Sequence, residues 1–404
     1  MGFSGQSKTA FIVTLAIWLA LAAFPGSPPV CAQTQTAKPA PKHSLRGRLR
    51  LTKFYDTPVP LPPDKPGTLI RAQPFDEYDL PLNVSAIRIL YHSTSPSGED
   101  VAASGVVLVP NRAAPPGGWP VIAWAHGFAG HARACAPSLS RNLHSGAFLN
   151  MYVNLGYAVV APDYAGLGSS ARNAFADLPT HAQDVIYSVP AARAAVPQLG
   201  LRWVGIGTAE GGAVALTVAE AEAQRGDRGY LGSVAISGAL DLKTLVERLA
   251  QGPWQDTLAS IAYGIKTVYP EFQLDHMLSS KGLDRYHQVE QDCVARDTAP
   301  AVPAAEMLDP GWEKDSQVQS FFERNLLGRT RALAPLLIIS GQDRQAEGTT
   351  SAEVVSRMCR QGDRIDFEAY PGADSAEIVG TSVSAQIAWI KARFSGHAAR
   401  STCP

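Results

Sequence analysis

Hydrophobic residues along this chain gather in short continuous runs instead of alternating with polar residues. Such a run is typical of a strand that is buried on both faces, as strands are in a parallel sheet. Six runs of this kind cover residues 119–127, 156–168, 202–207, 230–237, 335–340 and 364–372. Two β-rich stretches, at residues 85–95 and 101–110, precede them and are separated by the turn-forming sequence SPSGED.

Helical patterns appear between and after these runs. They occupy residues 213–226 and 352–362, and a last one at residues 382–394 closes the fold. Strands that alternate with helices in this way predict a doubly wound α/β architecture with a mostly parallel sheet.

One connection is too long for this regular alternation of strands and helices. About ninety residues separate the fourth run from the fifth, far more than a usual crossover. The interval holds amphipathic stretches broken by proline and glycine. We expect a helical cap at residues 241–330, above the sheet edge where ligands bind in α/β folds. The core would then comprise residues 51–240 and 331–404.

Composition and charge narrow the class of protein. The chain has 404 residues, of which 46% are hydrophobic and 18% are charged, with a net charge of −1. This is globular composition with enough apolar material for a large core. Nothing in the charge favours binding to nucleic acid or to an anionic membrane.

The N-terminus resembles an export signal. Lys8 precedes an apolar run at residues 10–24, which is long enough for a signal segment and short for a membrane span. A small-residue cleavage site follows, so we expect a signal peptide at 1–32, a flexible lead-in at 33–50 and a secreted or periplasmic protein without a membrane span after cleavage. An uncleaved anchor is the alternative. A lipoprotein at Cys31 is disfavoured because Val30 before it fits poorly.

Four cysteines remain after cleavage at residue 32. An even number in an exported chain favours disulfides, and four cysteines allow three pairings. We expect Cys135–Cys293 and Cys359–Cys403, because the second pair would attach the C-terminal tail to the last helical layer. Buried free thiols are the alternative.

The run at 202–207 leads into a glycine-rich turn with chemical meaning. Gly207 and Gly211 flank Ala209, Gly212 follows, and a helical pattern continues. In an α/β-hydrolase, a Gly-x-Ser-x-Gly elbow between strand and helix carries the nucleophilic serine, and small flanking residues let the two elements approach. The pattern predicts such an elbow, with alanine at the position of the central serine. An ordinary turn between a strand and a helix is the alternative.

The chain resembles the secretory lipase family of α/β-hydrolases over residues 50–396. The resemblance rests on stretches in the family's order: FYDTPVPLPPDKPGTLIR, RILYHSTSPSGEDVAASGVVLVP, GGWPVIAWAHGFAG, CAPS, GYAVVAPDYAGLG, RWVGIGTAEGG and YPGAD. It implies the α/β-hydrolase fold, with a helical lid, of a secreted serine esterase or lipase.

The resemblance also implies which positions would carry the catalytic triad. Ala209 stands at the nucleophile position, after Thr208 where the family usually has histidine. Asp343 stands at the acid position and is retained. Ser375 stands at the histidine position. Two of the three triad side chains are therefore missing.

The oxyanion-hole positions survive better. They are Phe128, in the loop after the run at 119–127, and Glu210, directly after the nucleophile position. Both would act through backbone N–H groups, which do not depend on the side chain. Loss of a nucleophile or a base costs on the order of a millionfold in turnover in a serine protease, so ordinary ester hydrolysis is not expected.

Other side chains offer few replacements. His126, His131 and His181 are candidate bases, although isolated histidines are more often structural. The spacing of His126, His131 and Cys135 fits no common zinc pattern, so we predict no metal and no cofactor. Asp163 and Asp374 follow strands and are expected to form loop hydrogen bonds.

Three functional hypotheses remain. The leading one is a secreted pseudoenzyme that binds an apolar small molecule, an ester-like lipid or a partner without hydrolysis. The second is a repurposed enzyme of lyase, cyclase or isomerase type that uses the pocket and the oxyanion hole. The third is a carboxylic-ester hydrolase that works through replacement residues. Whether the alanine is natural or an introduced knock-out, and the oligomeric state, are left open by the sequence.

Overall fold

The computed structural model describes residues 47–238, 241–249, 255–291, 293, 302–342, 347–373 and 377–404. The expected signal peptide lies outside these residues. So do Asp343 and Ser375, which stand at two of the expected triad positions, and Asp374, which is expected to form loop hydrogen bonds. Part of the expected lead-in is described, and there the Leu49 amide donates to the carbonyl of Leu139.

Within the described residues, one nine-stranded sheet organises the chain, in the order β1-β2-β3-β5-β4-β6-β7-β8-β9. The strands are β1 Leu69–Phe75, β2 Val84–Thr94, β3 Asp100–Pro110, β4 Trp119–Ala125, β5 Ala158–Pro162, β6 Leu199–Thr208, β7 Tyr230–Ile236, β8 Leu336–Gln342 and β9 Ile365–Pro371. Pairing is antiparallel from β1 through β3 to β5 and parallel from β5 to β9. The predicted mostly parallel sheet is confirmed.

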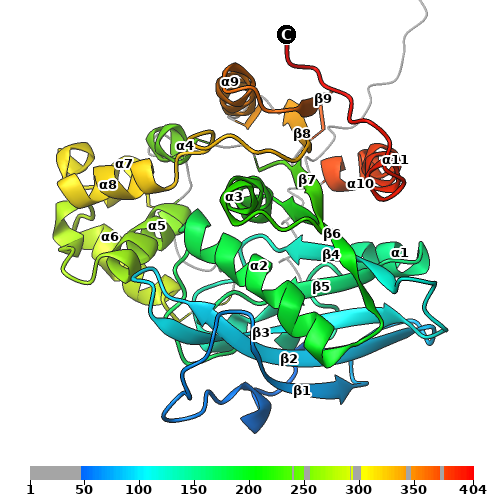
Figure 1. Ribbon diagram of the computed structural model, residues 1–404. Coiled ribbons are helices and arrows are strands. Elements are labelled where there is room, and N and C mark those ends of the chain that lie inside the picture. The colour runs from blue at the N-terminus through cyan, green and yellow to red at the C-terminus, as the bar shows by residue number, and fades with distance from the viewer. Residues whose placement is uncertain are drawn as a thin grey trace, which may run out of the picture. The chain divides into compact units, whose positions relative to one another are not determined.

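Helices lie on both faces of this sheet (Figure 1). They are α1 Gly146–Asn154, α2 Leu178–Ala195, α3 Glu210–Arg225, α4 Leu242–Leu249, α5 Gln255–Val268, α6 Ser280–Val289, α7 Ala304–Met307, α8 Ser316–Arg324, α9 Glu347–Arg360, α10 Glu377–Thr381 and α11 Val383–Phe394. Short 3₁₀ turns occupy Lys53–Tyr55, Arg133–Cys135, Pro137–Leu139, Leu274–His276 and Trp312–Lys314.

Two hydrophobic cores separate the helices by face. Residues of α2, α3 and α9 pack with one set of alternate strand residues, among them Ala123 and Ile338. Residues of α1, α10 and α11 pack with the other set, among them Ile122 and Ile339. Adjacent strand residues therefore face opposite helical layers, which explains why these strands read as continuous apolar runs.

Helices α4–α8 follow β7 and precede β8, in the interval where the sequence predicts a helical cap. We call them the α4–α8 insertion. They share a hydrophobic core of their own, which also includes Phe175 from the segment before α2. A β-carbon on Gly264 of α5 would lie 2.1 Å from the Phe175 carbonyl oxygen. The helix and that segment are therefore in backbone contact.

Both expected disulfides are present. Cys135 bonds Cys293 across 158 residues of sequence, with a Cα–Cα distance of 4.8 Å. Cys359 bonds Cys403 with a Cα–Cα distance of 5.4 Å, which attaches the C-terminal tail to the end of α9. The first bond joins the segment after β4 to the chain that follows α6. A β-carbon on Gly130 would lie 2.4 Å from the Cα of Cys293, so these two segments are also tightly packed.

Candidate active site

The elbow predicted from the glycine pattern lies between β6 and α3. β6 ends at Thr208 and α3 begins at Glu210. Ala209 joins them with φ 51° and ψ −123°, a combination that L-residues rarely adopt and that costs on the order of 1–3 kcal/mol. The Ala209 side chain is exposed. The chain thus keeps a strained conformation that presents position 209 outward, although the residue there has no reactive atom.

Contacts of the flanking glycines explain how this conformation is held. A β-carbon on Gly207 would lie 1.9 Å from the carbonyl oxygen of Gly211. A β-carbon on Gly211 would lie 2.1 Å from the carbonyl oxygen of Ala125, at the end of β4. Both neighbours are backbone atoms that cannot move aside cheaply. Strand, turn and helix therefore fit together only with glycine at these two positions.

The loop after β4 lies against the elbow. A β-carbon on Gly127 would lie 3.5 Å from the Cβ of Ala209 and 3.3 Å from the carbonyl oxygen of Thr208. Phe128, which follows, is 40% exposed. Glu210 is the first residue of α3, where helix N–H groups have no partner within the helix. The structure therefore brings Phe128 and Glu210, the two predicted oxyanion-hole residues, to neighbouring segments beside Ala209.

The Glu210 side chain turns toward the segment before α2. Its Oε1 accepts a hydrogen bond from the Ala176 amide at 3.0 Å and lies 3.3 Å from Nδ1 of His181. Burial alone would raise the pKa of Glu210, but His181 and the Ala176 amide hold it below its ordinary value. Burial alone would lower the pKa of His181, but Glu210 raises it above its ordinary value. The two side chains form a largely buried pair in which each favours the charged form of the other.

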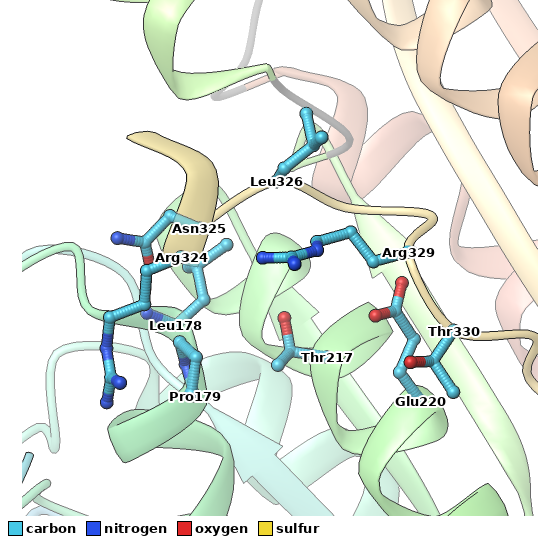
Figure 2. Close-up of a pocket in the computed structure, with 9 residues that line it drawn as sticks. All are labelled: Leu178, Pro179, Thr217, Glu220, Arg324, Asn325, Leu326, Arg329 and Thr330. Atoms are coloured by element: carbon cyan, nitrogen blue, oxygen red, sulfur yellow. The ribbon is translucent and has the colours of Figure 1, made fainter. Parts of the chain in front are cut away.

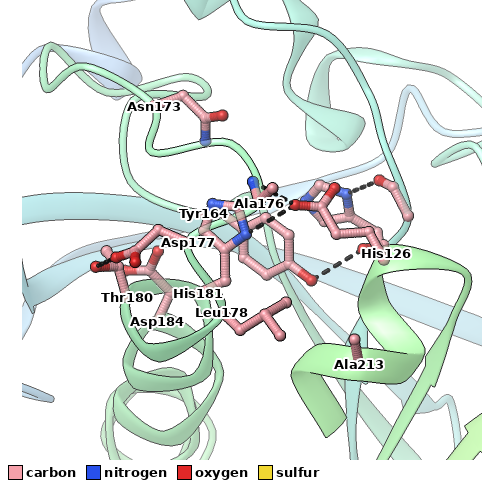
Figure 3. A network of polar contacts seen from close by, with 12 residues as sticks. His126, Tyr164, Asn173, Ala176, Asp177, Leu178, Thr180, His181, Asp184 and Ala213 are labelled. Atoms are coloured by element: carbon pink, nitrogen blue, oxygen red, sulfur yellow. Dashed lines mark hydrogen bonds and ion pairs between the residues drawn. The ribbon is translucent and has the colours of Figure 1, made fainter. Parts of the chain in front are cut away.

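Three rings are stacked beside this pair (Figure 3). Tyr164 lies between His126, with ring centroids 4.0 Å apart, and His181, with centroids 4.1 Å apart. The Tyr164 hydroxyl donates to the backbone carbonyl of His126 at 2.9 Å. Nδ1 of His126 lies 2.6 Å from the Gly127 carbonyl oxygen, and Nε2 lies 3.2 Å from that of Asp163. Burial lowers the pKa of His126 to about 4, so the ring is neutral near pH 7.

His131 belongs to a different group of side chains. Its Nε2 lies 2.8 Å from Oγ of Ser260 in α5. Its ring contacts those of Phe128, Phe175 and Tyr263, with centroids 4.3 to 5.2 Å apart. Among the described residues, Nδ1 has no hydrogen-bond partner. Burial lowers the pKa of His131 to about 4, so this ring is also neutral near pH 7.

These contacts show what the candidate replacement residues do. Each candidate histidine already has a neighbour: the Gly127 and Asp163 carbonyls for His126, Ser260 for His131, and Glu210 for His181. Cys135 is in a disulfide, and the described part of the chain holds no cluster of potential metal ligands.

Asp163 is a buried loop hydrogen-bonder, as expected. Its carboxylate accepts from the hydroxyls of Ser104 and Ser138 and from the Ser138 amide. Burial raises its pKa. Asp374, for which the same role is expected, lies outside the described residues.

Sequence reasoning missed the side chain of Glu210 and the ring of Tyr164. Glu210 was predicted only as a backbone donor, and Tyr164 was read as part of a strand run. Tyr164 has a positive φ of 63° just after β5, a conformation that a tyrosine does not signal, although Gly166 and Gly168 mark the loop that follows. The contact of Ser260 with His131 was also not predicted, because Ser260 lies within an amphipathic helical pattern that gives no sign of a polar partner.

A cavity of about 330 Å³ lies elsewhere (Figure 2). It is lined by Leu178, Pro179, Thr217, Glu220, Arg324, Asn325, Leu326, Arg329 and Thr330. Burial raises the pKa of Glu220 to about 7. None of these residues belongs to the elbow or to the loop after β4, so the cavity is not the predicted site.

No helix in the described residues combines the length and the apolar character that a transmembrane span needs.

Solved structures share this fold at low sequence identity. Candida antarctica lipase A in its closed state matches with a TM-score of 0.74 and 18% identity over 87% of each chain. The rice cell wall degrading esterase LipA from Xanthomonas oryzae, in a ligand-bound form, matches with a TM-score of 0.65 and 17% identity, over 79% of this chain and 95% of that one. A putative hydrolase from Legionella pneumophila matches with a TM-score of 0.69 and 18% identity, over 80% of this chain and 98% of that one.

These likenesses establish the fold as that of the α/β-hydrolases. A search of curated protein sequences gave no match. The family model for secretory lipases matches residues 145–402, which is more than half of the 404-residue chain. The chain therefore belongs to the secretory lipase family.

Proposed function

We propose that this protein is an exported pseudoenzyme of the secretory lipase family, which binds an apolar ligand through an ester or carboxyl oxygen without hydrolysing it. The observation that carries the proposal is Ala209, held outward at the elbow with both flanking glycines tightly packed. The two disulfides and the signal-like N-terminus support export.

The chemistry of the residues argues against hydrolysis. Alanine has no atom that can attack a carbonyl carbon. The position expected to hold the general base is Ser375, and a serine hydroxyl does not accept a proton near neutral pH. Loss of either group in a serine protease costs on the order of a millionfold in turnover, so ordinary esterase rates are not expected.

The remaining parts suit recognition of an oxygen atom. Backbone N–H groups of Phe128 and Glu210 are on neighbouring segments, and oriented amide donors stabilise a carbonyl or carboxylate oxygen. The exposed ring of Phe128 offers apolar surface beside them. A methyl group at position 209 leaves free the space that a serine oxygen would take.

Hydrolysis through replacement residues is a second candidate, and one observation favours it. Ser260 and His131 form a serine–histidine contact of 2.8 Å, which is the geometry of an activated nucleophile. Both side chains are only 2% exposed, and His131 has no carboxylate to orient it among the described residues. This candidate requires the insertion to open, so we rank it second.

Binding and chemistry can be tested separately. Isothermal titration with oleate and with methyl octanoate should show saturable binding to the wild type. A209W fills the position beside the amide donors and should weaken binding at least about tenfold, which corresponds to 1.4 kcal/mol. A213S, a small substitution four residues further along the chain, is the control. If wild type and A209W bind equally well, the ligand does not occupy the elbow.

Hydrolysis is tested with p-nitrophenyl butyrate and a fluorophosphonate label. Wild type should give background turnover and no label. A209S or S375H alone should add little, while the double variant should gain detectable turnover, because members of a catalytic unit are strongly non-additive. Stoichiometric labelling of wild type, mapped to Ser260 by peptide mass spectrometry, would instead establish the second candidate.

A further inference from the structure

We propose that the Glu210–His181 pair, braced by Tyr164 and His126, is a positioning device that fixes the loop after β4 against the elbow and makes ligand binding there depend on pH. The inference rests on the proposed function, since it concerns the same pair of backbone donors. The groups involved are positioning residues, which act through the backbone and not on the ligand.

The elbow side of the device is Glu210 itself. Its backbone begins α3 beside Ala209, and its carboxylate is anchored by the Ala176 amide at 3.0 Å and by His181 at 3.3 Å. His181 is in the first turn of α2, so the pair connects the N-terminal ends of two helices. Neither ring nitrogen of His181 makes a hydrogen bond of good geometry among the described residues. The contact with Glu210 is therefore mainly electrostatic, and its strength depends on protonation.

The loop side of the device is Tyr164. Its ring lies flat on His181, with an interplanar angle of 9°, and its other face lies on His126. Its hydroxyl holds the His126 carbonyl, two residues before Phe128. The ring of His126 reaches the carbonyl of Gly127, which in turn packs on Ala209. A continuous set of contacts thus runs from the carboxylate of Glu210 to the backbone that would carry the second donor.

Charged groups from every neighbouring element affect this pair. Asp184 on α2 and Asp177, the N-cap residue of that helix, both raise the pKa of His181. Asp177 is itself paired with Arg324, and burial raises the pKa of Asp184 to about 6.

On the loop after β4, two histidines face Glu210. His126 and His131 each experience its charge, and burial lowers the pKa of both to about 4. They stay neutral until the solution is strongly acidic and do not compete with His181 near neutral pH. His181, whose pKa is raised, is therefore the histidine of this cluster that keeps its proton to the highest pH.

The sign of the pH dependence follows from the two shifts. His181 has a raised pKa, so its contribution is complete below about pH 6.5 and is lost as pH rises through its folded-state pKa. Glu210 has a lowered pKa, so its contribution is complete above about pH 4.5 and is lost only in stronger acid. The device is intact at mildly acidic pH and loosens toward alkaline pH, where Glu210 becomes a buried carboxylate without a cation.

The experiment follows a ligand that does not titrate. Isothermal titration with methyl octanoate from pH 5 to pH 9 should show wild-type binding weaken by about tenfold, or about 1.4 kcal/mol, as His181 loses its proton. H181N and E210Q should bind more weakly at pH 5.5 and show no such inflection. E220Q is the matched control, because it removes another α3 carboxyl that titrates near pH 7 and should leave the inflection in place.

A ligand-free measurement separates this inference from the proposed function. The amide resonances of Phe128 and Glu210 should shift with pH in wild type and in E220Q, with one common midpoint, and should not shift in H181N. Y164F keeps the ring stack but removes the hydrogen bond from the Tyr164 hydroxyl to the His126 carbonyl. It should therefore retain the shift at Glu210 and reduce the shift at Phe128. If H181N fails to fold, Y164F provides the test in its place. If these amide resonances shift with pH but the protein binds no ester, the positioning device is supported and the proposed function is wrong. Ester binding with amides that do not respond to pH would overturn the device.

Discussion

The elbow and the α4–α8 insertion are held in place by different kinds of contact. At the elbow, the decisive neighbours are backbone atoms: Gly207 against Gly211, and Gly211 against Ala125. At the insertion, Gly264 and Gly130 also make close backbone contacts. Side-chain and covalent connections are added there, namely the His131–Ser260 contact and the Cys135–Cys293 disulfide. Arg172 adds an ion pair with Glu290 at 3.1 Å and lies 4.4 Å from the ring of Tyr263.

This difference explains why the geometry of the elbow does not depend on the residue at position 209. A backbone fit between strand, turn and helix is independent of the side chain at position 209, so serine can be lost without loss of the turn. The glycines are retained for packing, whichever residue they present. The elbow backbone therefore identifies the fold, whereas turnover also requires a nucleophilic side chain at its centre.

The largest expected effect comes from cutting the covalent connection to the insertion. C135S/C293S opens a loop of 158 residues, and C359S/C403S opens one of 44. Chain-entropy estimates give losses of about 5 and about 4 kcal/mol in the free energy of unfolding. Urea unfolding of both double variants measures the order. A larger loss for C359S/C403S would show that local packing, not loop closure, decides the contribution.

The next effect tests the elbow. G211A places a β-carbon 2.1 Å from the Ala125 carbonyl oxygen, which should lower the free energy of unfolding by about 3 kcal/mol. G380A is the matched control: it lies in a helix, no atom lies within 4 Å of its added β-carbon, and it should be neutral or slightly stabilising. Thermal unfolding compares the two. Equal midpoints would mean that the elbow relaxes easily and is not held by the glycines.

Much of the fold was visible in the sequence because it depends on burial. The apolar runs predicted β4 to β8, since strands buried on both faces need no polar alternation. The run at 364–372 also predicted β9, although this edge strand is buried only at its first two residues. β1 was not predicted, because it is an edge strand whose residues are all intermediate or exposed. Pro74 also interrupts its β-forming residues. α2 was missed because Pro179 and Pro190 obscure its helical pattern.

The candidate site was predictable only where backbone geometry determines it. The glycines identified the turn at Ala209, and the loop at Phe128 followed from its order in the chain. The Glu210–His181 pair could not be predicted, because it joins residues 29 positions apart through side-chain directions that no local pattern encodes. For Asp343 and Ser375 the sequence remains the only guide, since both lie outside the described residues.

The smallest expected effect concerns His131, which contacts both regions. Its pKa is lowered to about 4, so between pH 4 and 6.5 the unfolded chain binds a proton that the folded chain does not. Stability should therefore fall as pH decreases through this window, by an amount on the order of 2 kcal/mol from pH 6.5 to 4.5 for this residue. H131F removes the titrating group while keeping an aromatic ring among Phe128, Phe175 and Tyr263, so its urea midpoint should depend less on pH than that of the wild type. S260A is the control, since it removes the hydroxyl partner but leaves the histidine, and it should keep the wild-type slope. If H131F and wild type lose stability in parallel down to pH 4.5, His131 is protonated in the folded protein, and the contact between loop and insertion is an exposed one instead of the buried contact seen here.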